Sequence, residues 1–271
     1  MNLKKLFLTN NDCYKAGKKI TPKGIMVHST GANNPWLKRY VGPDDGLLGT
    51  NTNNNHWNNP GTAACVHAFI GKLADGSIAT YQTLPWNHRG WHAGGAANNT
   101  HISFEICEDG LTDGAYFSMV YQEAVELCVY LCKEYNLTEK DIICHSEGYK
   151  KGIASNHGDV MHWFPKHGKS MDTFRADVKS LLDSKQEDKV MNEQISALEK
   201  KVAELTSKVN ALANPMIYAW VDNNMPEWAR ETITKLMQNG YLKGDSEGKL
   251  NLTYDMLRIL VILDRAGAFN K

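Results

Sequence analysis

The chain has 271 residues with 30 basic and 30 acidic side chains, so its formal net charge at pH 7 is zero. This length favours two folded units, and the balanced charge argues against a nucleic-acid partner, which usually shows as a basic excess. We expect no membrane span, since no run of about 18 apolar residues is present. The apolar stretch after Met1 is too short for a signal peptide, and the six cysteines have no paired spacing, so we expect reduced thiols in a protein made in the cytoplasm.

Residues 1–183 alternate between strand patterns and helix patterns. Ala74-Asp75-Gly76 lies between two strand patterns and is a hairpin signal, whereas the asparagine-rich stretch 51–60 predicts an exposed loop. Apolar side chains recur at helical spacing over residues 118–135, which predicts an amphipathic helix. We therefore expect an α/β domain with a mixed central β-sheet flanked by helices. Its other predicted helices are 33–41 and 172–182, and its predicted strands are 25–28, 65–73, 77–84, 101–107 and 141–144.

Residues 184–213 form a different kind of segment, in which apolar residues recur at spacings of four and three. Such a heptad pattern predicts a helical, coiled-coil-like connector, and β-branched residues at one core position with leucine at the other favour a parallel dimer. We expect a homo-oligomer through residues 191–212; the alternative is a helix that lies on the body of the protein. Asn214-Pro215 is predicted to end the helix. The heptad residues are Met191, Ile195, Leu198, Val202, Leu205, Val209 and Leu212.

Residues 214–271 make a third segment, in which two helices are predicted. The first begins at Pro226 and stops at Gly240, and the second covers residues 254–265. We expect a small all-α module with a binding or assembly role, because no group of catalytic residues is found in it.

Two histidines end predicted strands and could meet at one edge of the sheet. These are His28 and His145, and Asp159 follows in a glycine-rich segment. Each histidine alone could equally be structural. Together, the three residues offer two nitrogen ligands and one oxygen ligand, a set that suits Zn²⁺ and leaves a fourth position for water. Such a zinc ion can lower the pKa of that water and polarise a carbonyl group.

A zinc hydrolase also needs a proton acceptor and a donor for the developing oxyanion. Glu105 is a carboxylate inside an apolar strand, which is costly to bury without a partner. It is a candidate general base; the alternative is an outward-facing strand residue. His157, two residues before Asp159, is the candidate donor to the oxyanion.

Four separated motifs within residues 20–182 resemble the zinc-dependent N-acetylmuramoyl-L-alanine amidases, whose fold is shared with peptidoglycan recognition proteins and many phage endolysins. The motifs are Val27-His28-Ser29-Thr30-Gly31, Trp91-His92-Ala93-Gly94, Ser103-Phe104-Glu105-Ile106, and the segment from His145-Ser146 to His157-Gly158-Asp159. The resemblance implies a zinc site at one edge of the sheet. It also implies cleavage of the amide between the lactyl group of N-acetylmuramic acid and L-alanine of the stem peptide.

By position, the resemblance makes His28, His145 and Asp159 the zinc ligands and Glu105 the base. His157 stands where many members carry lysine. Lysine keeps its charge to alkaline pH, whereas histidine is charged only below its pKa, so activity is expected to fall at alkaline pH.

Four aromatic side chains are candidates for substrate binding. Trp91 and His92 are predicted to line the groove, and Trp57 and Trp86 to contact sugar or peptide. Two other functions stay open. One is a non-catalytic peptidoglycan-binding protein that uses the same groove, and the other is a zinc peptidase that acts within the stem peptide.

The C-terminal segment is similar to a single S-layer-homology motif, on the residues Trp220-Val221-Asp222, Pro226-Glu227-Trp228-Ala229 and 240–245. The resemblance implies binding to a secondary cell-wall polymer, which oligomerisation through the connector would strengthen by avidity. A catalytic domain without a signal peptide fits a phage endolysin made in the host cytoplasm, which reaches the wall after holin-type release; a prophage or autolytic relative fits as well.

Overall fold

The computed structural model describes residues 1–213 and 216–269, without the side chains of residues 185–190 and 211–213. The chain divides into two compact units, Met1–Lys189 and Val190–Lys271, which we call unit 1 and unit 2. The predicted helix end at Asn214-Pro215 and the side chain of Leu212 therefore lie outside the described residues. No helix within the described ranges is both long and apolar enough to cross a membrane.

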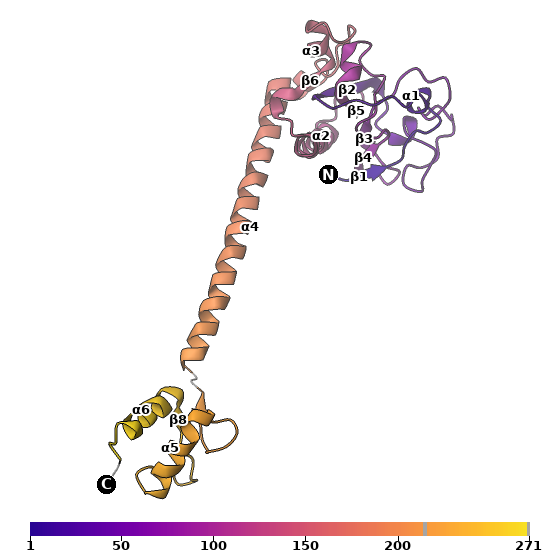
Figure 1. Cartoon of the computed structure of the whole chain (residues 1–271). Coiled ribbons are helices and arrows are strands. Elements are labelled where there is room, and N and C mark those ends of the chain that lie inside the picture. The colour runs from indigo at the N-terminus through magenta and orange to yellow at the C-terminus, as the bar shows by residue number, and fades with distance from the viewer. Residues whose placement is uncertain (214–215, 270–271) are drawn as a thin grey trace. The chain divides into compact units, whose positions relative to one another are not determined.

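Unit 1 is built on a six-stranded sheet in the order β1-β4-β3-β5-β2-β6 (Figure 1). Only the β3–β4 pair is antiparallel; every other neighbouring pair is parallel. All five predicted strands are confirmed, including the hairpin at Asp75-Gly76. A sixth strand, β1, was not predicted because three residues at a sheet edge are too few for a pattern. The strands are β1 (Leu3–Lys5), β2 (Gly24–Asn33), β3 (Ala68–Lys72), β4 (Ile78–Gln82), β5 (His101–Glu108) and β6 (Ile142–Cys144).

The predicted helix over residues 118–135 is confirmed as α2 (Gly114–Tyr135), which begins after the N-cap Asp113. The helix predicted over residues 33–41 is only a 3₁₀ turn, η1 (Leu37–Arg39). The chain after β6 begins a short helix, α3 (His145–Lys150). The remaining short helices of unit 1 are α1 (Asp12–Lys15), η2 (Ala96–Asn99), η3 (Glu139–Asp141) and η4 (Phe164–His167).

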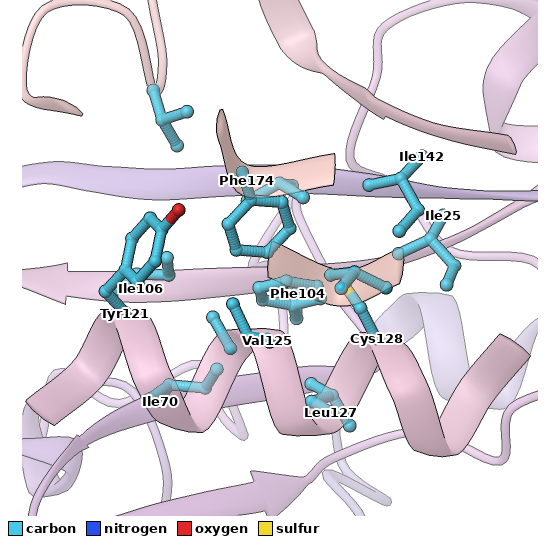
Figure 2. Close-up of a cluster of buried hydrophobic side chains, with 14 of the residues drawn as sticks. Ile25, Ile70, Phe104, Ile106, Tyr121, Val125, Leu127, Cys128, Ile142 and Phe174 are labelled. Carbon is cyan, nitrogen blue, oxygen red and sulfur yellow. The ribbon is translucent and has the colours of Figure 1, made fainter. Parts of the chain in front are cut away.

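Alternation along the strands gives the two faces of the sheet different roles. Phe104 and Ile106 of β5 face Val125 and Cys128 of α2 in the main core (Figure 2). Fully burying an apolar side chain of this size contributes about 1.5–3 kcal/mol, so this face stabilises unit 1. The intervening residues, such as Glu105, point to the other face. The Glu105 carboxyl is therefore directed away from α2.

A single helix, α4 (Met171–Ala213), covers both the predicted helix at 172–182 and the predicted connector. Its first turns belong to unit 1, where Phe174 and Val178 are buried in the core. No glycine or proline occurs between residues 171 and 213, so nothing in the sequence breaks the helix at residue 183. The helical state of the connector agrees with the prediction, whereas its pairing with another helix stays a prediction.

Unit 2 contains, after α4, the two predicted helices α5 (Glu227–Gln238) and α6 (Tyr254–Arg265). The prediction of an all-α module needs one correction, because β7 (Ile217–Tyr218) pairs antiparallel with β8 (Leu252–Thr253). Two-residue strands are too short to show an alternating pattern. A small core of its own holds these elements together, with Met225, Ile233 and Leu257 fully buried.

Candidate active site

Strand register brings the predicted site residues together on the sheet face opposite α2. In the parallel pair of β2 and β5, His28 lies opposite Glu105. In the pair of β2 and β6, Val27 lies opposite Cys144. The residues that follow them in the chain, His28 of β2 and His145 at the start of α3, therefore lie side by side. Asp159 reaches the same point from the loop that follows α3.

The three predicted metal ligands form a cluster whose donor atoms lie within 4.8 Å of one another. His28 Nδ1 is 3.0 Å from Asp159 Oδ2 and 3.1 Å from His145 Nδ1, and His145 Nδ1 is 3.8 Å from Asp159 Oδ2. Three donors about 2.0–2.2 Å from one ion in tetrahedral geometry would be roughly 3.4 Å apart. The observed separations bracket that distance, so the cluster could hold a metal ion.

The charge states of this cluster suit a cation. Burial and the neighbouring His28 lower the pKa of His145 to about 4, which leaves an imidazole lone pair free near neutral pH. Burial alone would raise the pKa of Asp159, but its hydrogen bond with His28 and the two histidine charges bring that pKa below its usual value. The site thus offers a neutral imidazole at His145 and a carboxylate at Asp159.

The far nitrogen of each histidine in the cluster also has a partner. His145 Nε2 is 3.2 Å from Ser155 Oγ, which donates to the carbonyl oxygen of Ala93 at 3.2 Å. His28 Nε2 is 3.0 Å from His92 Nδ1. If both Nδ1 atoms face a metal, both Nε2 atoms carry hydrogens, and these contacts fix the orientation of the rings.

Glu105 brings a carboxyl group without full hydrogen bonding into the site. Its Oε2 atom is buried and has no hydrogen-bond partner among the described residues. Burial, followed by the negative charges of Asp159 and Glu108, raises the pKa of the Glu105 carboxyl well above its ordinary value. A carboxylate with a raised pKa beside a ligand cluster is typical of a proton-transferring group.

These groups open into one cavity of about 690 Å³. His28, His145, Asp159 and Glu105 line it, together with three further residues predicted for the site, namely His157, Trp91 and His92. The ring of the exposed His157 lies 4.7 Å from that of His145, centre to centre. The cavity therefore contains seven of the nine predicted site residues.

The other two, Trp57 and Trp86, do not line the cavity. Trp57 packs edge-on against Phe69, with ring centres 4.9 Å apart, in a second core cluster. Trp86 is only 8 % exposed and stacks on the buried His67. Both tryptophans contribute to the core, so their prediction as substrate contacts is not supported by their positions.

Sequence reasoning overlooked a second polar group at the cavity. His162 lines the cavity, and its Nε2 is 2.8 Å from Glu108 Oε1, which also accepts from the backbone N–H of Gly31 at 3.1 Å. Glu108 is buried at the end of β5. It is a carboxylate in the same apolar strand as Glu105, and that signal could have identified it.

Comparison with known proteins identifies relatives of unit 1. The family described as N-acetylmuramoyl-L-alanine amidase matches residues 18–162. The amidase XlyA of Bacillus subtilis (strain 168) is 32 % identical over 134 residues, which cover 48 % of this chain and 39 % of XlyA. The amidase CwlH of the same organism is 28 % identical over 156 residues, 54 % of this chain and 53 % of CwlH. The chain thus spans about half or less of the length of these relatives.

Two solved structures are similar to the chain as well. The catalytic domain of XlyA superposes with a TM-score of 0.46 at 25 % identity, over 66 % of this chain and 99 % of that domain. The Staphylococcus aureus hydrolase AmiA, determined in complex with its ligand, gives a TM-score of 0.50 at 19 % identity, over 69 % of this chain and 85 % of AmiA. The second similarity supports the fold of unit 1.

Proposed function

The chain belongs to the N-acetylmuramoyl-L-alanine amidase family, and we propose that it is a zinc-dependent enzyme that cleaves the amide between N-acetylmuramic acid and L-alanine in peptidoglycan. The observation that carries the proposal is the convergence of His28, His145 and Asp159 in one cavity with Glu105, whose Oε2 atom has no hydrogen-bond partner among the described residues. A donor set of two imidazoles and one carboxylate suits Zn²⁺ and leaves a position for water or substrate.

Each residue then has a chemical role. Bound Zn²⁺ supplies a Lewis acid that polarises the scissile carbonyl and lowers the pKa of water. Glu105 accepts the proton of the attacking water, and its raised pKa brings it nearer to the working pH of a general base. His157, exposed at the cavity, donates a hydrogen bond to the developing oxyanion. Trp91 and His92 line the groove for the substrate.

Product analysis tests this function. Purified bacterial cell walls treated with the full chain are expected to release new amino-terminal L-alanine without new reducing sugar ends. A chelator is expected to abolish the release, and added Zn²⁺ to restore it. New amino termini inside the stem peptide would instead identify a zinc peptidase. Binding to walls without any release would identify a non-catalytic peptidoglycan-binding protein.

The role of His157 predicts a change in the pH profile. Lysine keeps its positive charge at higher pH than histidine does. The substitution His157→Lys is therefore expected to extend kcat towards alkaline pH, as measured on soluble muropeptides from pH 6 to pH 10. His162→Lys, at another histidine of the cavity, is the control and should leave the profile unchanged. An unchanged kcat profile for His157→Lys would remove His157 from the mechanism.

We further propose that residues 216–269 bind a secondary cell-wall polymer and that α4 pairs with α4 of a second copy. The first proposal rests on the S-layer-homology resemblance, and the second on six heptad residues, from Met191 to Val209, that are all exposed on α4.

Pairing of α4 predicts avidity for the wall. The double substitution Leu198→Lys with Leu205→Lys places charges in the heptad face and should weaken binding to whole walls by about 10-fold or more, since a second attachment is lost. Hydrolysis of soluble fragments should be unchanged, because both residues lie outside unit 1. Sedimentation of enzyme with walls measures the effect, with Lys200→Glu, on the side of the same helix away from the heptad face, as the control. Equal binding by wild type and the double variant would contradict the pairing.

A further inference from the structure

Exposed apolar side chains are concentrated in unit 2. Among the described residues, 17 large hydrophobic side chains are exposed in unit 2 and only five in the much longer unit 1. Soluble monomers rarely expose large contiguous apolar patches, and such patches mark interaction surfaces.

Helix α6 is apolar on two faces. Leu257 and Val261 are buried in the core of unit 2. The outward side presents Met256, Ile259, Ile262 and Leu263, which are 49 %, 56 %, 61 % and 41 % exposed. Their spacing of three, three and one places them along one face of a helix, which we call the α6 face. A helix that is apolar on both sides is expected to be covered on both sides.

We infer that the α6 face is an interface with the α6 face of a second copy of this chain. The inference rests on the proposed pairing of α4, whose heptad residues have the pattern of a parallel two-stranded coiled coil. In that register Lys201 meets Thr206 of the other helix and Gln194 meets Glu199, so no like charges oppose each other across the seam. The partner of the heptad face is therefore the α4 helix of a second copy of this chain.

Chain connectivity extends this pairing to α6. Only residues 214 and 215 lie between Ala213, where α4 ends, and Met216, where the rest of unit 2 begins. A parallel pair of α4 helices therefore holds the two C-terminal modules within a few residues of each other, at an effective concentration in the millimolar range. At that effective concentration, two α6 faces can associate even if their affinity for each other is weak.

The small area of the α6 face explains why contact between two α6 faces requires the pairing of α4. Four side chains cover much less than the roughly 800 Å² per partner that a stable interface buries. The face alone is too small to hold two free copies together. In a two-fold contact each patch meets the same patch of the other copy, so residues near the axis lie against their own counterparts.

Single introduced cysteines test the inference in the full chain, because all six native cysteines are buried. Ile259→Cys and Ile262→Cys place a thiol in the α6 face, and Glu231→Cys places a control thiol on the exposed side of α5. Under mild oxidation, at least one α6 thiol is expected to form disulfide-linked dimers about 10-fold or more faster than the α5 thiol, because both thiols share the proximity that α4 pairing provides but only the α6 thiols lie in the contact. Adding Leu198→Lys with Leu205→Lys separates the two copies and should slow cross-linking from both positions to the rate of unpaired chains.

Light scattering of the same proteins separates the outcomes. A dimeric chain with fast cross-linking from α6 supports the inference. A dimer in which α6 and α5 thiols react equally slowly overturns it, because α4 would then pair alone. A monomer or a higher oligomer also overturns it, and so does fast cross-linking that survives the two lysines. Hydrolysis of soluble muropeptides, measured in parallel, reports on the proposed amidase function independently of all these results.

Discussion

Replacing Glu105 with glutamine is expected to lower kcat/KM on soluble muropeptides by about 10²–10⁴-fold, the usual contribution of a positioned general base. Glutamine has nearly the same shape but cannot accept a proton. Because Glu105 lies opposite His28 in the strand register and is no member of the ligand cluster, the variant should still bind one Zn²⁺. Activity near that of the wild type would show that another group takes the proton.

The same substitution is expected to stabilise the metal-free protein. The pKa of the Glu105 carboxyl is raised in the folded state by burial and by Asp159 and Glu108. The unfolded chain therefore loses this proton at lower pH than the folded chain does, and the stability contributed by protonated Glu105 is lost as pH rises above about 4.3, its unfolded pKa. Glu105→Gln removes this loss, so its advantage should be near zero at pH 4 and grow towards neutral pH.

Urea unfolding in the presence of a chelator measures this effect. The gain expected near pH 7 is about 1–3 kcal/mol, because glutamine has no negative charge to bury whereas ionised Glu105 has one. Glu108→Gln on the same strand is the matched control. Glu108 accepts hydrogen bonds from His162 and Gly31, so its substitution should lower stability instead. A loss of stability in both variants would mean that Glu105 is an ordinary structural carboxylate.

The fold of unit 1 and the ligand cluster could both be predicted from local patterns. Val27-His28 and Cys144-His145 each end an apolar strand run, and parallel neighbours bring such ends to one edge. His28 and Asp159 lie far apart in the sequence, but the sheet places His145 beside His28 and the loop after α3 brings Asp159 to the same point. The order of the strands, by contrast, depends on non-local pairing that no single segment specifies.

The sequence does not distinguish aromatic residues of the core from aromatic residues that line a binding groove. Trp57 follows a polar, asparagine-rich stretch, yet its ring packs on Phe69 in the core. Trp91, in a glycine-rich motif, lines the cavity. Large rings contribute to cores and to binding grooves through the same apolar area, so composition alone could not separate them. The second contacts of the ligands, such as Ser155 behind His145, arise only once the loop after α3 has folded back.

Removing His28 is expected to abolish zinc binding and to lower activity on muropeptides by about a thousandfold or more, since the metal contributes several kcal/mol to the transition state. His28 Nδ1 is the donor nearest to both others, 3.0 Å from Asp159 Oδ2 and 3.1 Å from His145 Nδ1. Without it, two donors 3.8 Å apart remain. Two ligands are too few for a catalytic zinc site, which keeps three protein ligands.

Thermal unfolding with and without Zn²⁺ gives a readout of His28→Ala that does not depend on catalysis. Zinc at about a thousand times its Kd should stabilise the wild type by about 4 kcal/mol, whereas His28→Ala should show no zinc-dependent shift. His162→Ala removes another imidazole from the same cavity and should keep the full shift. Glu105→Gln should keep it too while losing activity, which separates the base from the ligands. A zinc-dependent shift retained by His28→Ala would require the metal to be held by other residues.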